Sequence, residues 1–567
     1  MQYFKKHRIS YSVMILSALS FILIYGTNIL NVTYTDWLLC GGDHSQHYLG
    51  WKFFRCAPWQ WYIGMMNNIA YPYSESVIFT DSIPLLAVFF KIFSGILPKS
   101  FQYFGLWGLL CFILQGYLAS LILRRYLERD LHVIIGSLFF VFAPILLRRM
   151  YWHTSLGGQW LILLALVLFL YHDEWSESSG RTAGVWGLMG ALCASIHIYF
   201  LPMCGVILFG FVCIDFWKRR KLLRALAPVA TYAMGAIFVV WWLGGLISGM
   251  DNGAPGLGYY SFNLAGFWNT QEWSFFFPQM KNYADGQYEG FAYLGLGFCV
   301  LLVFTLLAML QYFFSEQLYQ REQLRRVCRE HIQIGICILM GLLSIAMAAS
   351  QEVSFGSKLL YKIPIPHAIE ELWAVFRASG RLVWPAVYLL MIFLIVTGAR
   401  GVAHLDRKYP TFPKRGLKTT STVVTLVLGI SLIFQIVDLH EQLRNKHNEF
   451  APIQIHSSEL ESPFWEQAVM ERDIQHIVFA DKEHMSQEQL YSFADFASEH
   501  GITINDFYFA RALTHPIEEV ADDFMKHPNQ NTLYIFTEEA REQSKAYDFV
   551  YYLEDGFIIG VTDAFFF

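Results

Sequence analysis

The residues best suited to chemistry follow the first long apolar stretch of the chain and begin with Gly41-Gly42-Asp43-His44. An Asp after two glycines is typical of a helix N-cap, whose side chain accepts a hydrogen bond from a backbone N–H group. The same carboxylate can instead act as a general base, and partial burial would raise its basicity. Asp81 supplies a second acid deeper in the same segment. We therefore predict Asp43 and Asp81 as the catalytic carboxylates, with helix capping as the alternative role for Asp43.

Side chains that could contact a sugar lie in this segment and in a later one, 248–290, which is rich in Gly, Asn and aromatic residues. The candidates for sugar or acceptor binding are His44, His47, Trp51, Tyr288 and Glu289. The first three recur at i, i+3 and i+7 of a predicted helix, so they share one face. Aromatic residues also form ordinary belts at membrane interfaces, and this alternative stays open.

Arginines gather at two further places. Arg377 and Arg381 belong to the stretch 376–381, and Arg148-Arg149 ends a predicted span just before Tyr151, Trp152 and His153. The planar guanidinium group suits a phosphate, which predicts a binding site for a lipid-linked phosphate. The alternative is that these side chains only extend toward lipid head groups.

The elements that must position these residues are membrane spans. Of the 567 residues 55% are hydrophobic and 15% charged, whereas soluble domains carry about a quarter charged residues. Apolar runs predict about eleven transmembrane helices, at 11–32, 102–123, 131–147, 155–171, 183–198, 200–217, 224–247, 291–313, 332–350, 380–399 and 418–438. The run Ser82–Leu97 is short and contains Pro84 and Lys91, so it is predicted to be an interfacial or re-entrant helix.

Basic residues in short loops orient these spans, because they favour the cytoplasmic side. The N-terminal Lys5-Lys6-His7-Arg8 then lies inside, together with the other basic loops. Those loops contain Arg124, Arg125, Arg129, Arg181, Lys218-Arg219-Arg220-Lys221, Arg321, Arg325, Arg326, Arg329, Arg407-Lys408 and Lys414-Arg415. We predict a multi-pass protein of the inner cell membrane with a cytoplasmic N-terminus and an extracytoplasmic C-terminal domain.

The C-terminal part of the chain differs from the rest in charge and pattern. Residues 440–567 contain 24 Asp and Glu against 8 Lys and Arg, whereas the remainder contains 22 against 33. Short β-like runs at 477–479 and 532–536 alternate with helix-like runs at 487–500, 517–526 and 538–546. This predicts a membrane domain, 1–439, followed by a small soluble α/β domain, 440–567.

Metal, disulfide and nucleotide-binding motifs limit the classes of function that this sequence allows. No CxxC or Cys/His metal spacing occurs, although Cys40 and Cys56 could form a disulfide around the Asp43 helix in an oxidising envelope. The absence of a Walker motif and of a nucleotide fingerprint argues against an ATP-driven machine.

These motifs resemble the GT-C superfamily of polyprenol-phosphate-dependent glycosyltransferases. Gly42-Asp43-His44 followed by Ser82–Leu97 is similar to the first outside loop of that superfamily. The membrane body as a whole, about four fifths of the chain, looks like a related bacterial multi-span family. The similar stretches are 42–51, 79–85, 286–290 and 376–381.

The resemblance implies a GT-C-like α-helical fold and a site at the outer membrane surface. It implies sugar transfer from a polyprenyl-phosphate donor to a cell-envelope glycan or glycolipid acceptor, with inversion, among membrane lipid and without nucleic acid. Paired acids are missing because Ser45 stands in the second position, so a divalent metal, Mg²⁺ or Mn²⁺, is an option rather than a predicted cofactor. A lipid or glycan transporter (or flippase) and a non-catalytic assembly protein are the alternative classes.

Overall fold

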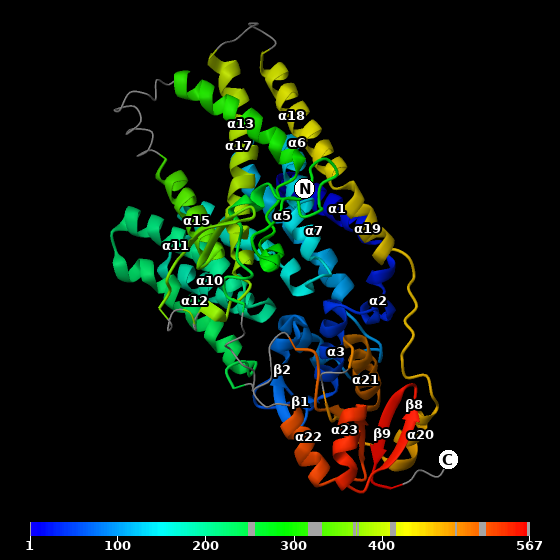
Figure 1. Ribbon diagram of the computed structural model, residues 1–567. Coiled ribbons are helices and arrows are strands. Elements are labelled where there is room, and N and C mark those ends of the chain that lie inside the picture. The colour runs from blue at the N-terminus through cyan, green and yellow to red at the C-terminus, as the bar shows by residue number, and fades with distance from the viewer. Residues whose placement is uncertain are drawn as a thin grey trace.

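The computed structural model describes residues 2–247, 256–315, 331–366, 370, 373–408, 416–481, 485–509 and 517–563. In these residues a long helical body is followed, at its lower end in Figure 1, by a small mixed domain. Several residues of the predicted inside loops lie outside the described part: Arg321, Arg325, Arg326, Arg329, Lys414 and Arg415.

Long apolar helices form the body. Among the described residues, nine helical segments are long and apolar enough to cross a membrane: Arg8–Tyr25, Phe104–Arg124, Asp130–Arg149, Phe200–Arg219, Leu222–Trp242, Leu296–Phe314, Ile332–Ala349, Ser379–Gly401 and Ser421–Asp438. They belong to α1 Gln2–Tyr25, α5 Phe104–Arg124, α6 Asp130–Val141, α7 Pro144–Arg149, α11 Phe200–Arg219, α12 Leu222–Trp242, α13 Leu296–Ser315, α15 Ile332–Ala349, η6 Ser379–Val383, α17 Trp384–Lys408 and α18 Gly416–Asp438. The chain is therefore an integral membrane protein, as predicted.

Two of the predicted spans are not long and apolar enough to count among these membrane-crossing helices. The predicted span 155–171 contains α8, Trp160–Leu170, within a shorter apolar segment, Thr154–Leu170. The predicted span 183–198 is the helix α10, Ser179–Ile196, which begins with the polar sequence Ser-Gly-Arg-Thr. Both predicted elements are helices, but only nine of the eleven qualify as spans by length and hydropathy.

The predicted span 131–147 is bent. Its two helices, α6 and α7, are separated at Phe142-Ala143, where Ala143 is extended with φ −68° and ψ 123°. Pro144 explains the break, because proline disfavours the helical conformation in the preceding residue and lacks an N–H donor. The bend matters because α7 carries Arg148 and Arg149.

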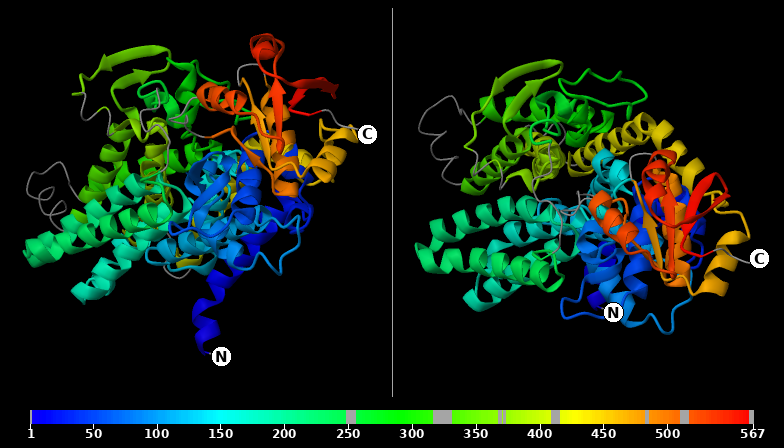
Figure 2. Two further views of the ribbon diagram at one scale, coloured as in Figure 1. Left: turned by 90° about the horizontal axis from the view of Figure 1, so that it is seen from below. Right: turned by 60° about the horizontal axis from the view of Figure 1, so that its bottom comes forward.

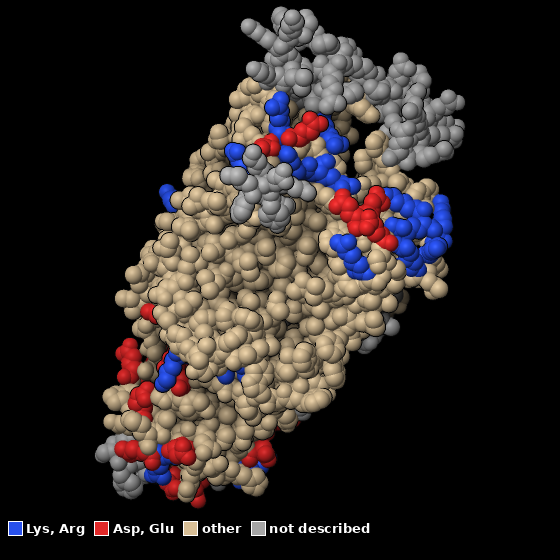
Figure 3. All heavy atoms as spheres, turned by 180° about the vertical axis from the view of Figure 1, so that it is seen from behind, with Lys and Arg blue, Asp and Glu red and all other residues tan. Residues whose placement is uncertain are grey.

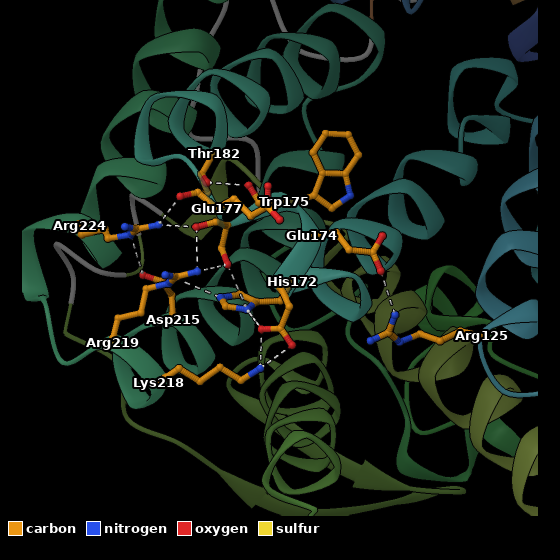
Figure 4. A network of polar contacts seen from close by, with 12 residues as sticks. Arg125, His172, Glu174, Trp175, Glu177, Thr182, Asp215, Lys218, Arg219 and Arg224 are labelled. Atoms are coloured by element: carbon orange, nitrogen blue, oxygen red, sulfur yellow. Dashed lines mark hydrogen bonds and ion pairs between the residues drawn. The ribbon is translucent and has the colours of Figure 1, made fainter.

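A charged network ties helix ends together (Figure 4). Buried Asp215 on α11 lies 3.2 Å from His172 of α9, His172–Trp175, and accepts a hydrogen bond of 3.0 Å from Arg219. Close by, Arg125 at the end of α5 pairs with Glu174 at 3.5 Å. The structure thus gathers residues from two predicted inside loops at one end of the helices, and neighbouring carboxylates stabilise them.

Charge is banded along the surface. On the face in Figure 3, Lys and Arg gather toward one end, a broad band with little charge follows, and Asp and Glu prevail near the other end. An uncharged belt of this kind suits the hydrocarbon layer, where ionised side chains are costly.

The C-terminal domain is a five-stranded sheet with helices. Its strand order is β6-β5-β7-β9-β8, with β5 parallel to β6 and β7, and β9 antiparallel to β7 and β8. The strands are β5 His476–Phe479, β6 Thr503–Ile504, β7 Thr532–Phe536, β8 Val550–Glu554 and β9 Phe557–Val561, and the helices are α20 Phe464–Arg472, α21 Gln487–His500, α22 Ile517–Lys526 and α23 Glu538–Gln543. The predicted α/β class is confirmed, and β5, β7 and three helices coincide with predicted runs.

The hairpin β8–β9 was not predicted, although the sequence contains its signal. Asp555-Gly556 lies between the two strands, with φ 49° and 82° respectively. An Asp-Gly pair between apolar runs favours such a left-handed hairpin turn.

This domain docks on the segment that carries Asp43, as Figures 1 and 2 show. Buried Lys52 of α3, Asp43–Cys56, pairs with Asp495 at 2.5 Å and with Glu499 at 3.3 Å. The backbone N–H of Tyr71, between β1 Met65–Ala70 and β2 Tyr73–Ser76, donates to Ile504 O at 2.8 Å. The remaining short helices near this junction are α2 Asp36–Leu39, α4 Pro84–Ile92 and α19 His440–Phe450. The nine-residue α4 falls within the predicted interfacial run.

Candidate active site

Asp43 is the first residue of α3, and its side chain does not cap the helix. The N-cap is Gly42, whose φ of 75° and ψ of −171° suit glycine and turn the chain into the helix. Asp43 Oδ2 instead lies 2.7 Å from His153 Nδ1, and both side chains are 22% exposed. The capping alternative therefore fails, and the carboxylate forms a partly accessible pair with a histidine.

Asp81 is positioned beside the same helix. Ser82 Oγ donates to His47 O at 2.7 Å and lies 2.8 Å from Thr80 Oγ1. The contact is possible because a Cβ at Gly50 would lie only 2.4 Å from the Thr80 Cβ. Asp81 adopts φ 53°, and its Oδ1 lies 3.4 Å from His197 Nε2, just beyond the end of α10. The two predicted acids thus stand on one helix face, each with its own histidine.

Electrostatics keep both carboxylates ionised. Burial raises the pKa of Asp43, but the hydrogen bond and charge of His153 outweigh it, so the pKa lies below the usual Asp value. Burial also raises the pKa of Asp81, and the charge and hydrogen bond of His197 bring it below the usual value as well. The expectation that burial would make Asp43 more basic was wrong, because a histidine partner stabilises the ionised form.

The three residues on the predicted helix face differ in position. His47 is buried with Nδ1 3.3 Å from Thr154 Oγ1, and burial lowers its pKa to about 4. His44 stacks on Trp37 with 6.3 Å between ring centroids, and burial lowers its pKa to about 4 too. Trp51 is fully buried and donates from Nε1 to Phe101 O at 3.0 Å. The structure places Trp51 in the packed interior, where no sugar ring could stack on it.

Glu289 joins two buried arginines. Its carboxylate accepts two hydrogen bonds from Arg381, Nε at 2.7 Å and Nη2 at 2.9 Å, and pairs with Arg149 Nη2 at 2.5 Å. Burial raises the pKa of Glu289, but the charges of Arg149 and Arg381 outweigh it and hold the pKa well below the usual value. Both carboxylate oxygens are therefore engaged by arginine, which corrects the prediction that Glu289 contacts sugar.

Close backbone packing brings Glu289 to Arg381. A Cβ at Gly380 would lie 2.7 Å from Gly290 Cα, so only glycine allows η6 to approach η5, Asp285–Gly290, this closely. Gln287 holds η5 in place, because its Nε2 donates to Ser354 Oγ at 2.7 Å. The stretches 286–290 and 376–381 therefore meet in one ion cluster, to which Arg149 also belongs.

The other predicted residues lie beside this cluster. Arg148 Nη1 donates to Gln271 Oε1 at 2.7 Å, and its guanidinium carbon lies 4.4 Å from the centroid of the Phe291 ring. The half-buried Arg377 has its guanidinium carbon 5.9 Å from the centroid of the Tyr260 ring. Tyr288 is 37% exposed and stacks on Trp152.

One short segment connects the carboxylate pair with the arginine cluster. His153 N donates to Arg149 O at 2.9 Å, so the two residues share a single turn of chain. This turn therefore brings the Asp43–His153 pair close to the Arg149–Glu289 pair.

Among the described residues, no group of three or more His, Cys, Asp and Glu side chains is placed to hold a metal ion. Asp43 and Asp81 are each paired with a separate histidine instead.

A disulfide around the Asp43 helix does not form. Cys40 and Cys56 are both free thiols. Cys56 ends the 14-residue α3 and Cys40 precedes its first residue, so a helix roughly 20 Å long at 1.5 Å per residue separates them. A disulfide requires Cα atoms within about 7 Å.

Sequence reasoning missed the histidine partners. Neither His153 nor His197 has a local sequence signal for pairing with an acid. A weak signal existed for His153, since it is polar and directly follows an arginine pair at the end of a span.

Three solved structures are similar in arrangement, all of the oligosaccharyltransferase of Archaeoglobus fulgidus. The form tethered to an acceptor peptide has 10% identity and a TM-score of 0.44, over 100% of this chain and 75% of that one. The apo form has 11% identity and a TM-score of 0.46, over 99% of this chain and 75% of that one. The complex with Zn and sulfate has 10% identity and a TM-score of 0.43, over 97% of this chain and 73% of that one.

Family models give a direct assignment. No curated protein matches the sequence. Residues 464–562 match the DUF6311 C-terminal domain. Residues 14–440 match the domain of unknown function DUF6311, and the chain therefore belongs to the DUF6311 family.

Proposed function

We propose that this protein is a glycosyltransferase that moves a sugar from a polyprenyl-phosphate donor to a hydroxyl group of a glycan or glycolipid at the outer face of the inner membrane. One observation carries the proposal: the partly exposed Asp43–His153 pair adjoins the buried cluster of Arg149, Arg381 and Glu289. A proton acceptor beside cations is the minimum that transfer from a phosphate leaving group requires.

The pair defines where the proton goes. An ionised carboxylate only accepts hydrogen bonds, so His153 Nδ1 donates to Asp43 across 2.7 Å. The acceptor oxygen attacks the anomeric carbon and its proton passes to the pair. The bond between the anomeric carbon and the phosphate oxygen breaks, and the phosphate keeps the electron pair. A single displacement inverts the anomeric centre.

The arginines supply positive charge beside the leaving phosphate. Glu289 offsets one of the two positive charges of Arg149 and Arg381, so this buried group keeps a net charge of about +1. Arg148 and Arg377 add positive charge at its edge. Cations aimed at a developing negative charge in a partly dry site are an effective means of lowering a barrier.

A transfer assay tests the function. The purified protein in lipid nanodiscs would receive a panel of synthetic polyprenyl-phosphate sugars with an envelope glycan extract as acceptor. We expect acceptor-dependent release of polyprenyl phosphate from at least one donor. No release from any donor, with folded protein confirmed by thermal unfolding, would contradict the proposal.

Arg377→Lys is expected to raise KM for the donor several-fold with little change in folding, because Lys keeps the charge but loses the two-pronged hydrogen bonding of guanidinium. Initial rates against donor concentration measure this. Arg400→Lys is the matched control, since Arg400 lies far along α17 and donates to Tyr126 O. Equal donor kinetics in Arg377→Ala and the wild type would remove Arg377 from the donor site.

Orientation follows from the charge pattern and can be checked separately. Reporter fusions after Arg129 and Lys221 should give a cytoplasmic signal, and fusions after Ser100 and in the C-terminal domain an extracytoplasmic one. An extracytoplasmic signal after Arg129 would place a further span in Ser82–Leu97 and invert the later helices.

A further inference from the structure

A polar groove lies beside the arginine cluster, outside the Asp43 site. It has a volume of about 510 Å³, and its lining includes Arg148, Gln271, Glu272, Gln279, Asn282 and Tyr288. This volume is typical of sites for small molecules. We propose that the groove binds a neutral saccharide. The inference deepens the proposed function and rests on it only for the origin of that saccharide.

Hydrogen-bonding side chains dominate the lining. Gln279 Nε2 donates to Glu272 Oε1 at 3.2 Å, and Arg148 donates to Gln271. Arg148 is only 6% exposed, and among the described residues its buried Nε has no hydrogen-bond partner. Side-chain amides both donate to and accept from hydroxyl groups, and ionised carboxylates accept from them, in the paired manner that a sugar offers. A buried donor without a partner is costly unless a ligand satisfies it.

Charge balance favours a neutral ligand. The lining contains two cations, Arg148 and Lys281, and two carboxylates, Glu272 and Asp285. An anionic ligand would meet both carboxylates, and a cationic one both basic groups. A polyhydroxylated neutral molecule suits these groups without repulsion.

Tyr288 supplies a flat apolar surface. Its ring lies parallel to Trp152, with an interplanar angle of 8° and 6.0 Å between centroids, and it is 37% exposed. The guanidinium carbon of Arg148 lies 5.1 Å from the centroid of the Trp152 ring. Such a layered arrangement fixes the tyrosine in one orientation, and an exposed ring beside amides can stack on the C–H face of a sugar. A membrane belt residue would need no polar groove beside it.

The groove is preformed. Asn269 forms two hydrogen bonds with Met280. Its Oδ1 accepts from Met280 N at 2.8 Å, and its Nδ2 donates to Met280 O at 2.9 Å. Asp438 at the end of α18 accepts from Tyr293 Oη at 2.7 Å and Leu296 N at 2.9 Å, which holds the end of the segment. A rigid site loses little conformational entropy on binding.

The groove adjoins the phosphate-binding candidates. Arg148 and Tyr288 line it, and their chain neighbours Arg149 and Glu289 form the buried ion pair. A saccharide in the groove therefore lies beside the site proposed for the donor phosphate. It can be the glycan of the donor or the glycan of the acceptor.

Binding of free oligosaccharides tests the inference without any transfer reaction. Chitotetraose, maltotetraose and cellotetraose, at millimolar concentration, would be titrated into the protein in nanodiscs while tryptophan fluorescence and saturation-transfer NMR are recorded. We expect saturable binding of at least one, weakened about tenfold or more by Tyr288→Ala. Gln279→Ala should also weaken it, and Tyr283→Ala, an exposed tyrosine of the same segment outside the groove lining, should not.

Different results would contradict the saccharide groove and the proposed function. Absence of saturable binding by all three oligosaccharides, or equal affinity in Tyr288→Ala and the wild type, would overturn the saccharide groove. In the wild-type protein, failure of transfer with intact oligosaccharide binding would count against the proposed function alone. In the transfer assay, a higher KM for donor in Tyr288→Ala assigns the groove to the donor glycan, and a higher KM for acceptor assigns it to the acceptor.

Discussion

Asp43→Asn is expected to lower the transfer rate by roughly 10²–10⁴-fold, the usual contribution of general-base catalysis, while the protein stays folded. The amide oxygen of Asn can still accept the hydrogen bond that His153 Nδ1 donates at 2.7 Å in the wild type. Because Asp43 caps no backbone N–H group, the substitution costs the helix no cap. Single-turnover rates, with thermal unfolding as the folding check, measure the effect.

Two companion variants locate the proton acceptor. Asp81→Asn is the matched control, since Asp81 is a carboxylate beside the same helix with a separate histidine at 3.4 Å. Normal activity in Asp43→Asn with an inactive Asp81→Asn would transfer the role to Asp81. His153→Ala should be nearly as inactive as Asp43→Asn if the pair acts together. Retention of most activity would leave the carboxylate alone as the base.

The pH dependence has a definite sign. Because the pKa of Asp43 lies below the usual Asp value, its carboxylate stays ionised at every pH above about 4. Protonation of Asp43 should therefore reduce the rate only in more acidic solution.

Glu289→Gln is expected to be the most destabilising conservative change in the site, by about 3–5 kcal/mol. The amide cannot neutralise Arg149 and Arg381, which are 1% and 8% exposed, so positive charge would stay buried without a counter-ion. Thermal and denaturant unfolding in detergent measure the loss. Asp285→Asn is the matched control because Asp285 is an exposed acid of the same short helix, η5, and surface changes usually cost less than about 0.5 kcal/mol.

The contribution of Glu289 also depends on pH. Its folded-state pKa is well below the usual Glu value, so the stabilisation is fully present above about pH 4.3 and is lost as the pH falls toward the folded-state pKa. Wild type and Glu289→Gln should therefore converge in stability in acid. Equal unfolding of the two at neutral pH would contradict the role of Glu289 as the counter-ion of both arginines.

The sequence by itself determined the elements. Apolar runs of membrane-spanning length need no partner to be recognised, so each predicted span lies over a helix in the described residues. Alternation of short apolar and amphipathic runs was enough to predict the α/β domain that contains β5 and β7. Local rules also placed Asp43 at the start of α3, because two glycines favour a turn into a helix.

Only the tertiary structure decided what the polar residues do. Whether Asp43 caps or forms a pair depends on His153, which comes from beyond α7 and reaches it because Pro144 bends the chain. Glu289 and Arg381 are 92 residues apart and meet only where Gly290 and Gly380 allow their backbones to touch. The sequence cannot reveal such pairs, since a charged side chain carries the same local signal whether its partner is water, a ligand or a distant residue, and the chain path alone selects among them.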